Sequence, residues 1–134
     1  MTRNPISFAT GFCALVLAVS GCAYTPRETP PGMSIYTEGG YFTPFYAEVV
    51  YAAKEGQRPR IFLFGKIEHF EDFLKEKEVP ENQHKKYIAR GKNRETVVVR
   101  DLVGVELREN PNYTDKLLAK YRARNGLTDQ PTGP

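Results

Sequence analysis

The clearest group of acid–base residues lies in the middle of the chain. Glu68, Glu71 and Asp72 fall close together, and glycoside cleavage needs two carboxyl groups about 5–10 Å apart. The same stretch carries Phe70 and Phe73 at helical spacing. Because a helix that buries an aromatic face turns its charges toward water, the sequence offers no desolvating cleft that would separate two carboxyl pKa values. A solvated polar face is the favoured interpretation.

A metal site would have to use His69 and His84, the two histidines of the chain. Catalytic zinc takes three protein ligands in close spacing. The two histidines form no paired motif, and no cysteine accompanies them. We therefore predict two surface histidines and no metal site. The glycine pairs of the chain match no phosphate-cradling motif, so no cofactor is predicted.

Cationic side chains gather in the second half of the chain. Residues 85–94 contain five basic residues and no acid, whereas residues 68–81 contain six acids and two lysines. A basic face on a membrane-attached domain can lie against anionic headgroups, with about 1 kcal/mol per cation near the surface. Solubilising surface charge is the alternative, because charge runs are usually solvated. The candidate contact residues are Lys85, Lys86, Arg90, Lys92 and Arg94.

The first residues have the layout of a secretory signal. Arg3 is the one charge among residues 1–5, and residues 6–19 are apolar apart from small or hydroxyl-bearing side chains. A transmembrane helix is the alternative, but this apolar stretch would span about 21 Å against a hydrocarbon core of about 30 Å. Residues 1–21 are therefore predicted to be a signal peptide.

The leader ends with Val19, Ser20, Gly21 and Cys22, an order that resembles the lipobox of bacterial lipoproteins. The resemblance implies that the Cys22 thiol receives a diacylglycerol, that the chain is cut before it, and that the new amino terminus is open to acylation. One acyl chain binds a membrane reversibly, whereas two or three make attachment effectively permanent. The next residue is Ala and not Asp, which in enteric-type bacteria implies sorting to the outer membrane. An ordinary cleavage site with an incidental cysteine is the alternative.

Processing at this cysteine would remove two of the three serines and one of the two cysteines. The mature protein keeps one serine, Ser34, and its cysteine would carry lipid. A serine or cysteine hydrolase, which needs such a nucleophile beside a base, is therefore disfavoured. No intramolecular disulfide is predicted, because Cys13 lies in the leader. The net charge of +3 falls by one when Arg3 is lost, which is too close to balance to predict nucleic-acid binding.

Composition divides the rest of the chain into a tether, a domain and a tail. Residues 22–40 are rich in proline and glycine and poor in aliphatic residues, which favours extended, solvated backbone. They are predicted to be the lipidated N-terminus and a flexible tether, with an ordered arm over the sheet as the alternative for their second half. Residues 41–126 are predicted to form the globular domain, and residues 127–134 a disordered polar tail.

The first half of the domain predicts a hairpin and a helix. Residues 46–53 and 60–64 flank a polar turn, and the second run is apolar on both faces, as in a covered central strand. Residues 67–74 carry apolar side chains at helical spacing, and Pro80 closes that helix.

The second half predicts another hairpin and a final helix. Residues 85–89 and 95–100 flank a glycine-containing turn, and residues 102–107 either extend the second strand or turn a corner. An Asn-Pro pair at 110–111 begins the last helix, and Gly126 stops it. The order β-β-α-β-β-α predicts an α+β domain, a small antiparallel sheet with both helices on one face.

No residue pattern predicts a reaction, so a binding role is favoured over an enzyme. We expect a lipid-anchored envelope module whose partner is a periplasmic or outer-membrane protein, contacted through the aromatic segment 41–51 or a hairpin edge. A small envelope enzyme, or an enzyme inhibitor acting on peptidoglycan or a periplasmic protein, is the alternative; it requires a pocket where carboxylates or Lys66 have shifted pKa values. A structural linker that uses the basic patches is the third hypothesis.

Overall fold

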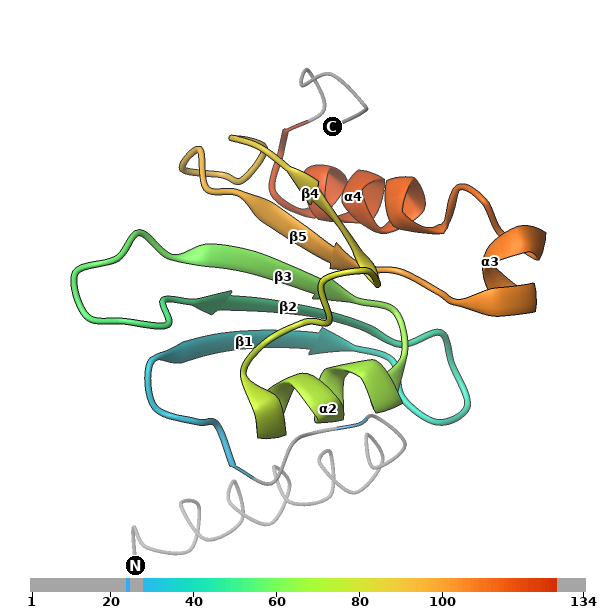
Figure 1. Ribbon diagram of the computed structural model, residues 1–134, viewed down its shortest axis with the longest axis horizontal. Helices are drawn as coiled ribbons and strands as arrows, with labels where there is room; N and C mark the ends of the chain where they lie inside the picture. Colours follow the sequence, from blue (N-terminus) through green and yellow to red (C-terminus); the bar gives the residue numbers. More distant parts are fainter. Residues whose placement is uncertain (1–23, 25–27, 128–134) are drawn as a thin grey trace, which may run out of the picture.

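The computed structural model describes residue 24 and residues 28–127. It shows an α+β fold with a five-stranded mixed sheet in the order β1-β2-β3-β5-β4 (Figure 1). The predicted signal peptide, Cys22 and nearly all of the predicted tail lie outside the described residues. The strands and helices are β1 (Met33–Glu38), β2 (Tyr46–Tyr51), β3 (Arg60–Phe64), α2 (Ile67–Glu76), β4 (His84–Tyr87), β5 (Val97–Arg100), α3 (Gly104–Glu109) and α4 (Tyr113–Arg124).

The edge strand β1 lies inside the range that the sequence predicts as a tether. It pairs with β2 along its whole length, from Met33 opposite Tyr51 to Glu38 opposite Tyr46. Met33 is buried, and Ile35 packs against the same core. The prediction of a flexible tether is therefore wrong for residues 33–38. Their β-branched and aromatic side chains suit a half-buried strand, and this outweighs the prolines and glycines on either side.

The sheet is mixed, so the prediction of a fully antiparallel sheet is wrong at its centre. β5 lies beside β3 and runs parallel to it, with Ile61 opposite Val97 and Leu63 opposite Val99. The two predicted hairpins are confirmed, because β2 pairs antiparallel with β3 and β4 pairs antiparallel with β5. Three consecutive valines make β5 apolar on both faces and suit a covered position. β4 carries two exposed lysines, which suits a sheet edge.

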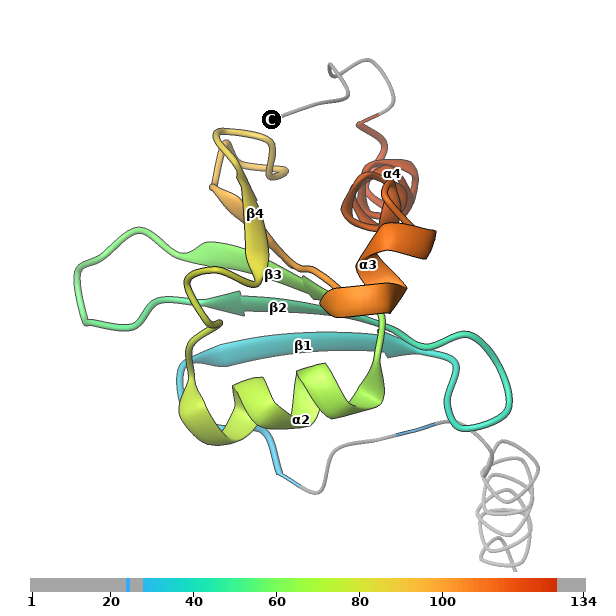
Figure 2. The same cartoon turned by 45° about the vertical axis from the view of Figure 1, so that its right-hand side comes forward.

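The two long helices cover opposite faces of the sheet (Figure 2). α2 packs Phe70 and Phe73 onto the face that carries Phe62 and Phe64. α4 packs Leu118 and Tyr121 onto the face that carries Ile61 and Leu63. The prediction of a covered central strand is confirmed. The prediction that both helices share one face is wrong, because a strand that is apolar on both sides needs cover on both.

Local signals place the helix ends close to their predicted positions. α2 ends at Glu76, and Lys77 follows with a left-handed backbone (φ 58°). α4 begins one residue after Asn112 rather than at Pro111, and Gly126 (φ 70°) follows its end as predicted. The segment 102–107, predicted as strand or corner, contains most of the short helix α3.

Candidate functional site

A hollow on the α2 face of the sheet has the size of a ligand site. Its volume is about 640 Å³, inside the range of about 300–1,000 Å³ that is usual for small-molecule sites. It lies where the amino ends of β3 and β5 meet the C-terminal end of α2. Tyr51, Phe62 and Val98 give it an apolar lining, and the acidic and basic side chains around them give it charge.

Five cations from separate elements line this hollow, which we call the basic cavity. Each is placed there by local structure; for example, Lys86 pairs with Val98 across the β4–β5 ladder and therefore shares its face. Three carboxylates and His84 line it as well. Glu95 already accepts a 2.6 Å hydrogen bond from the Asn93 backbone N–H, which holds the β4–β5 turn. The cations are Arg58, Arg60, Lys77, Lys86 and Arg94.

The cations of the basic cavity are not neutralised by ion pairs among the described residues. The ion pairs found there join Lys66 to Glu106, Lys120 to Glu38, and Arg124 to Glu48, all away from the cavity. The five cations outnumber the three carboxylates of the same hollow, and a concave surface with an excess of one charge sign attracts the opposite charge. The cavity is therefore suited to an anionic ligand that also has an apolar part.

The five basic residues selected from the sequence do not form one face. Lys86 and Arg94 line the basic cavity, but Lys85 lies on the opposite face of β4, because it pairs with Val99 of the α4-side core. Lys92 is at the β4–β5 turn, where its backbone N–H donates to the Tyr121 hydroxyl at 2.8 Å. Arg90 is half-buried and has contacts of its own. Contact with an anionic membrane surface stays a prediction.

Sequence reasoning missed Arg58, Arg60 and Lys77, which complete the cavity. They stand outside the basic run and reach the site only through the fold. Lys77 is the left-handed residue that follows α2. Arg58 lies in the loop before β3, and Arg60 is the first residue of β3. The Arg-Pro-Arg run at 58–60 was the available signal, because it places two cations at the start of a buried strand.

The acidic group of α2 lies on a solvated surface, as the sequence indicates. Glu68, Glu71 and Asp72 are all exposed. The hydroxyl of Tyr24 donates to Glu71 at 3.1 Å. No cluster of three potential metal ligands occurs in the described part of the chain.

The two histidines differ in their surroundings. His84 is partly exposed, and its Nδ1 lies 2.8 Å from the Pro80 carbonyl oxygen. His69 is half-buried, and its Nδ1 has no hydrogen-bond partner among the described residues. Burial of the imidazole, with help from the charges of Arg100 and Lys66, lowers the pKa of His69 below its ordinary value. The neutral form of His69 is therefore favoured in the fold.

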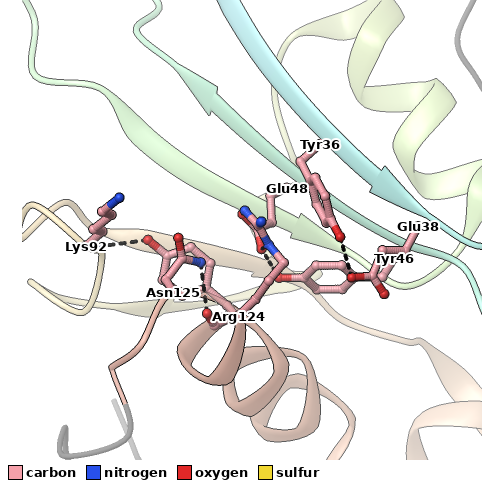
Figure 3. A network of polar contacts seen from close by, with 8 residues as sticks. Tyr36, Glu38, Tyr46, Glu48, Lys92, Arg124 and Asn125 are labelled. Atoms are coloured by element: carbon pink, nitrogen blue, oxygen red, sulfur yellow. Dashed lines mark hydrogen bonds and ion pairs between the residues drawn. The ribbon is translucent and has the colours of Figure 1, made fainter.

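A polar network on the α4 face has its charges paired internally (Figure 3). The Arg124 guanidinium donates to both oxygens of Glu48, at 2.6 and 2.5 Å, and lies 3.7 Å from the centre of the Tyr36 ring. The Tyr46 hydroxyl donates to Glu48 at 2.7 Å, and burial raises the pKa of that phenol. The Tyr36 hydroxyl donates to Glu38 at 2.5 Å. This network clamps α4 to β1 and β2, which is a structural role.

Comparison with protein-family models, curated proteins and solved structures finds no match. The part of the chain that the structure describes contains no helix long and apolar enough to cross a bilayer. Function is therefore inferred from the residues of this chain alone. The arrangement with the clearest chemistry is the basic cavity, where cations outnumber carboxylates around a few apolar side chains.

Proposed function

We propose that this protein is a lipid-anchored, non-enzymatic binding module of the bacterial cell envelope, attached through Cys22 and at the outer membrane rather than the inner. Its basic cavity binds an acidic, partly apolar segment of a periplasmic or outer-membrane protein. The observation that carries the binding role is the excess of cations in one hollow: five basic side chains without ion pairs among the described residues, against three carboxylates.

The sheet edge beside the cavity favours a peptide over a small molecule. β4 is an edge strand of the sheet, so one side of its backbone has no neighbouring strand among residues 28–127. An extended segment can add to such an edge through main-chain hydrogen bonds, while pockets select alternate side chains. Lys86 lies on this strand and lines the cavity. A segment with acidic residues at every second position would therefore place its carboxylates toward the cavity cations.

Lipid attachment at Cys22 is tested by intact mass and membrane fractionation in a Gram-negative host, with wild type beside Cys22→Ala. We expect the wild type to lose residues 1–21, to gain the mass of two or three acyl chains and to fractionate with membranes. The variant should lack the acyl mass. A wild type that keeps its leader, or that is free of membranes, would contradict the anchor.

Binding in the cavity is tested with a labelled synthetic peptide in which Glu and Val alternate, measured by fluorescence anisotropy. Lys86→Glu reverses a charge inside the cavity, and Lys85→Glu makes the same change one residue away on the opposite face. We expect Lys86→Glu to weaken binding about tenfold, equivalent to about 1.4 kcal/mol, and Lys85→Glu to have little effect. Binding should also weaken as salt rises.

A second matched pair tests the start of β3. Arg60→Glu changes the first residue of β3, which lines the cavity, whereas Lys54→Glu changes an exposed residue of the preceding loop that does not line it. Loss of binding only for Arg60→Glu supports the proposal. Equal losses for both members of either pair would indicate general charge attraction, and absence of any salt-sensitive binding would refute the cavity as an anionic site.

A further inference from the structure

The exposed large apolar side chains gather mainly at the end of the sheet opposite the basic cavity. Tyr41 is 68% exposed and Phe42 is 86% exposed, both in the loop between β1 and β2. Val103, Val105 and Leu107 are exposed around α3. Because β3 and β5 are parallel, the segments that follow them share one end and the segments that precede them share the other. The β1–β2 loop and α3 both lie at the right-hand end of Figure 1.

These two exposed segments flank the same spot on the surface. Lys66, which directly precedes α2, lines a shallow hollow together with Tyr41. The Lys66 ammonium also pairs with Glu106 of α3 at 2.7 Å. Lys66 therefore lies near both the β1–β2 loop and α3. We call this surface the apolar end; its residues are Tyr41, Phe42, Val103, Val105 and Leu107.

The described chain starts at this same end. Tyr24 is buried, its backbone N–H donates to the Gly39 carbonyl at 3.0 Å, and its ring meets Tyr41, Phe45 and Phe70 edge-on. Only one residue separates Tyr24 from Cys22. Two residue steps span at most about 7 Å between the Cα atoms, even when fully extended. A lipid on Cys22 would therefore enter the membrane close to the β1–β2 loop.

We propose that the apolar end docks directly on the bilayer that holds the Cys22 lipid. The domain then rests on the membrane, and the basic cavity at the opposite end faces away from it toward soluble partners. This inference depends on the proposed lipid anchor. The amphipathic Tyr41 ring is of the kind favoured at headgroup depth, and Phe42 with the aliphatic side chains adds apolar area. A covalent anchor supplies a high effective concentration, so a small contact surface is sufficient.

The chain contains no tryptophan, so a single tryptophan can report on this contact. Phe42→Trp places the reporter at the apolar end. Ile88→Trp is the matched control, because Ile88 is 65% exposed and follows β4 at the cavity end. Each full-length lipoprotein is purified, checked by intact mass for acylation, and reconstituted into vesicles of phosphatidylethanolamine and phosphatidylglycerol with brominated acyl chains.

We expect the Phe42→Trp emission to shift to the blue in vesicles and to be quenched about twofold or more by the brominated lipid, since the ring enters the interfacial region. The Ile88→Trp emission should stay like that of exposed tryptophan and escape quenching. If the acyl mass is present but both reporters behave as water-exposed, docking is refuted and the lipid anchor still stands.

Two other results would also overturn the inference. If Phe42→Trp shifts to the blue without quenching, and the shift depends on protein concentration, then a second copy of the chain covers the apolar end. If intact mass shows no acyl chain, the proposed anchor fails, and docking that depends on it fails with it. The mass measurement and the quenching measurement therefore separate the two proposals.

Discussion

Removal of the Arg124 guanidinium should be among the most destabilising changes at the surface of this domain. Glu48 is only 6% exposed and accepts two hydrogen bonds from Arg124 and one from Tyr46. Arg124→Met would leave this carboxylate buried with the Tyr46 hydroxyl alone. Loss of one partner from a buried ion pair costs about 3–5 kcal/mol. The Arg124 side chain is one-third exposed, so water can partly replace it, and we expect about 3 kcal/mol.

The measurement is urea unfolding followed by far-ultraviolet circular dichroism at pH 7. A double-mutant cycle with Glu48→Gln separates the pair from its surroundings. We expect Arg124→Met with Glu48→Gln to be less destabilising than the sum of the two single changes, because no charge then stays buried. Lys120→Met is the control in the same network; its partner Glu38 is about one-third exposed, and exposed pairs contribute below about 1 kcal/mol.

The result that would refute this reasoning is an Arg124→Met loss below about 1 kcal/mol that equals the Lys120→Met loss. Water would then hydrate Glu48 as well as the guanidinium does. The network would then not hold α4 to the sheet, and the pairing of Glu48 with Arg124 would add almost nothing to the free energy of unfolding.

Three further predictions concern pH, backbone and core. Because the pKa of His69 in the folded state lies below its ordinary value of 6.5, the free energy of unfolding should be unaffected by this group above about pH 6.5 and should decrease as pH falls through the lowered pKa. The urea midpoint of His69→Gln should depend less on pH across that range. Gly39→Ala and Gly56→Ala both place a side chain at positive φ, but only at Gly39 would the new Cβ meet the Pro44 carbonyl, so Gly39→Ala should cost about 1–3 kcal/mol more by urea unfolding. Phe70→Ala, at a fully buried ring between α2 and the sheet, should cost about 3–5 kcal/mol in the same assay.

Local patterns predicted the elements that depend on nearby residues. The hairpin turns, the aromatic stripe of α2 and the apolar run of β3 each signal their structure within ten or so positions, and the structure agrees. β1 was not predicted from the sequence because prolines and glycines flank its half-buried side chains. The partner strand that makes it stable, β2, supplies a register that the β1 sequence does not contain.

Pairings between distant segments could not be derived from local patterns. That β5 rather than β4 adjoins β3 follows from the greater burial of three valines, a comparison that needs the whole sheet. The basic cavity shows the same limit. The charge run supplied Lys86 and Arg94, but Lys77 joins them only because α2 brings its C-terminal end back to the start of β3.

The parallel ladder between β3 and β5 also has a consequence for folding kinetics. The strands on either side of it form hairpins between near neighbours in sequence, whereas this ladder joins Ile61 to Val97 across a long intervening segment. Closure of a long loop delays such contacts, so we expect the two halves of the sheet to form before they join. Until then, the two most apolar strands would each present an open edge, and this is the step at which the chain is most exposed to aggregation.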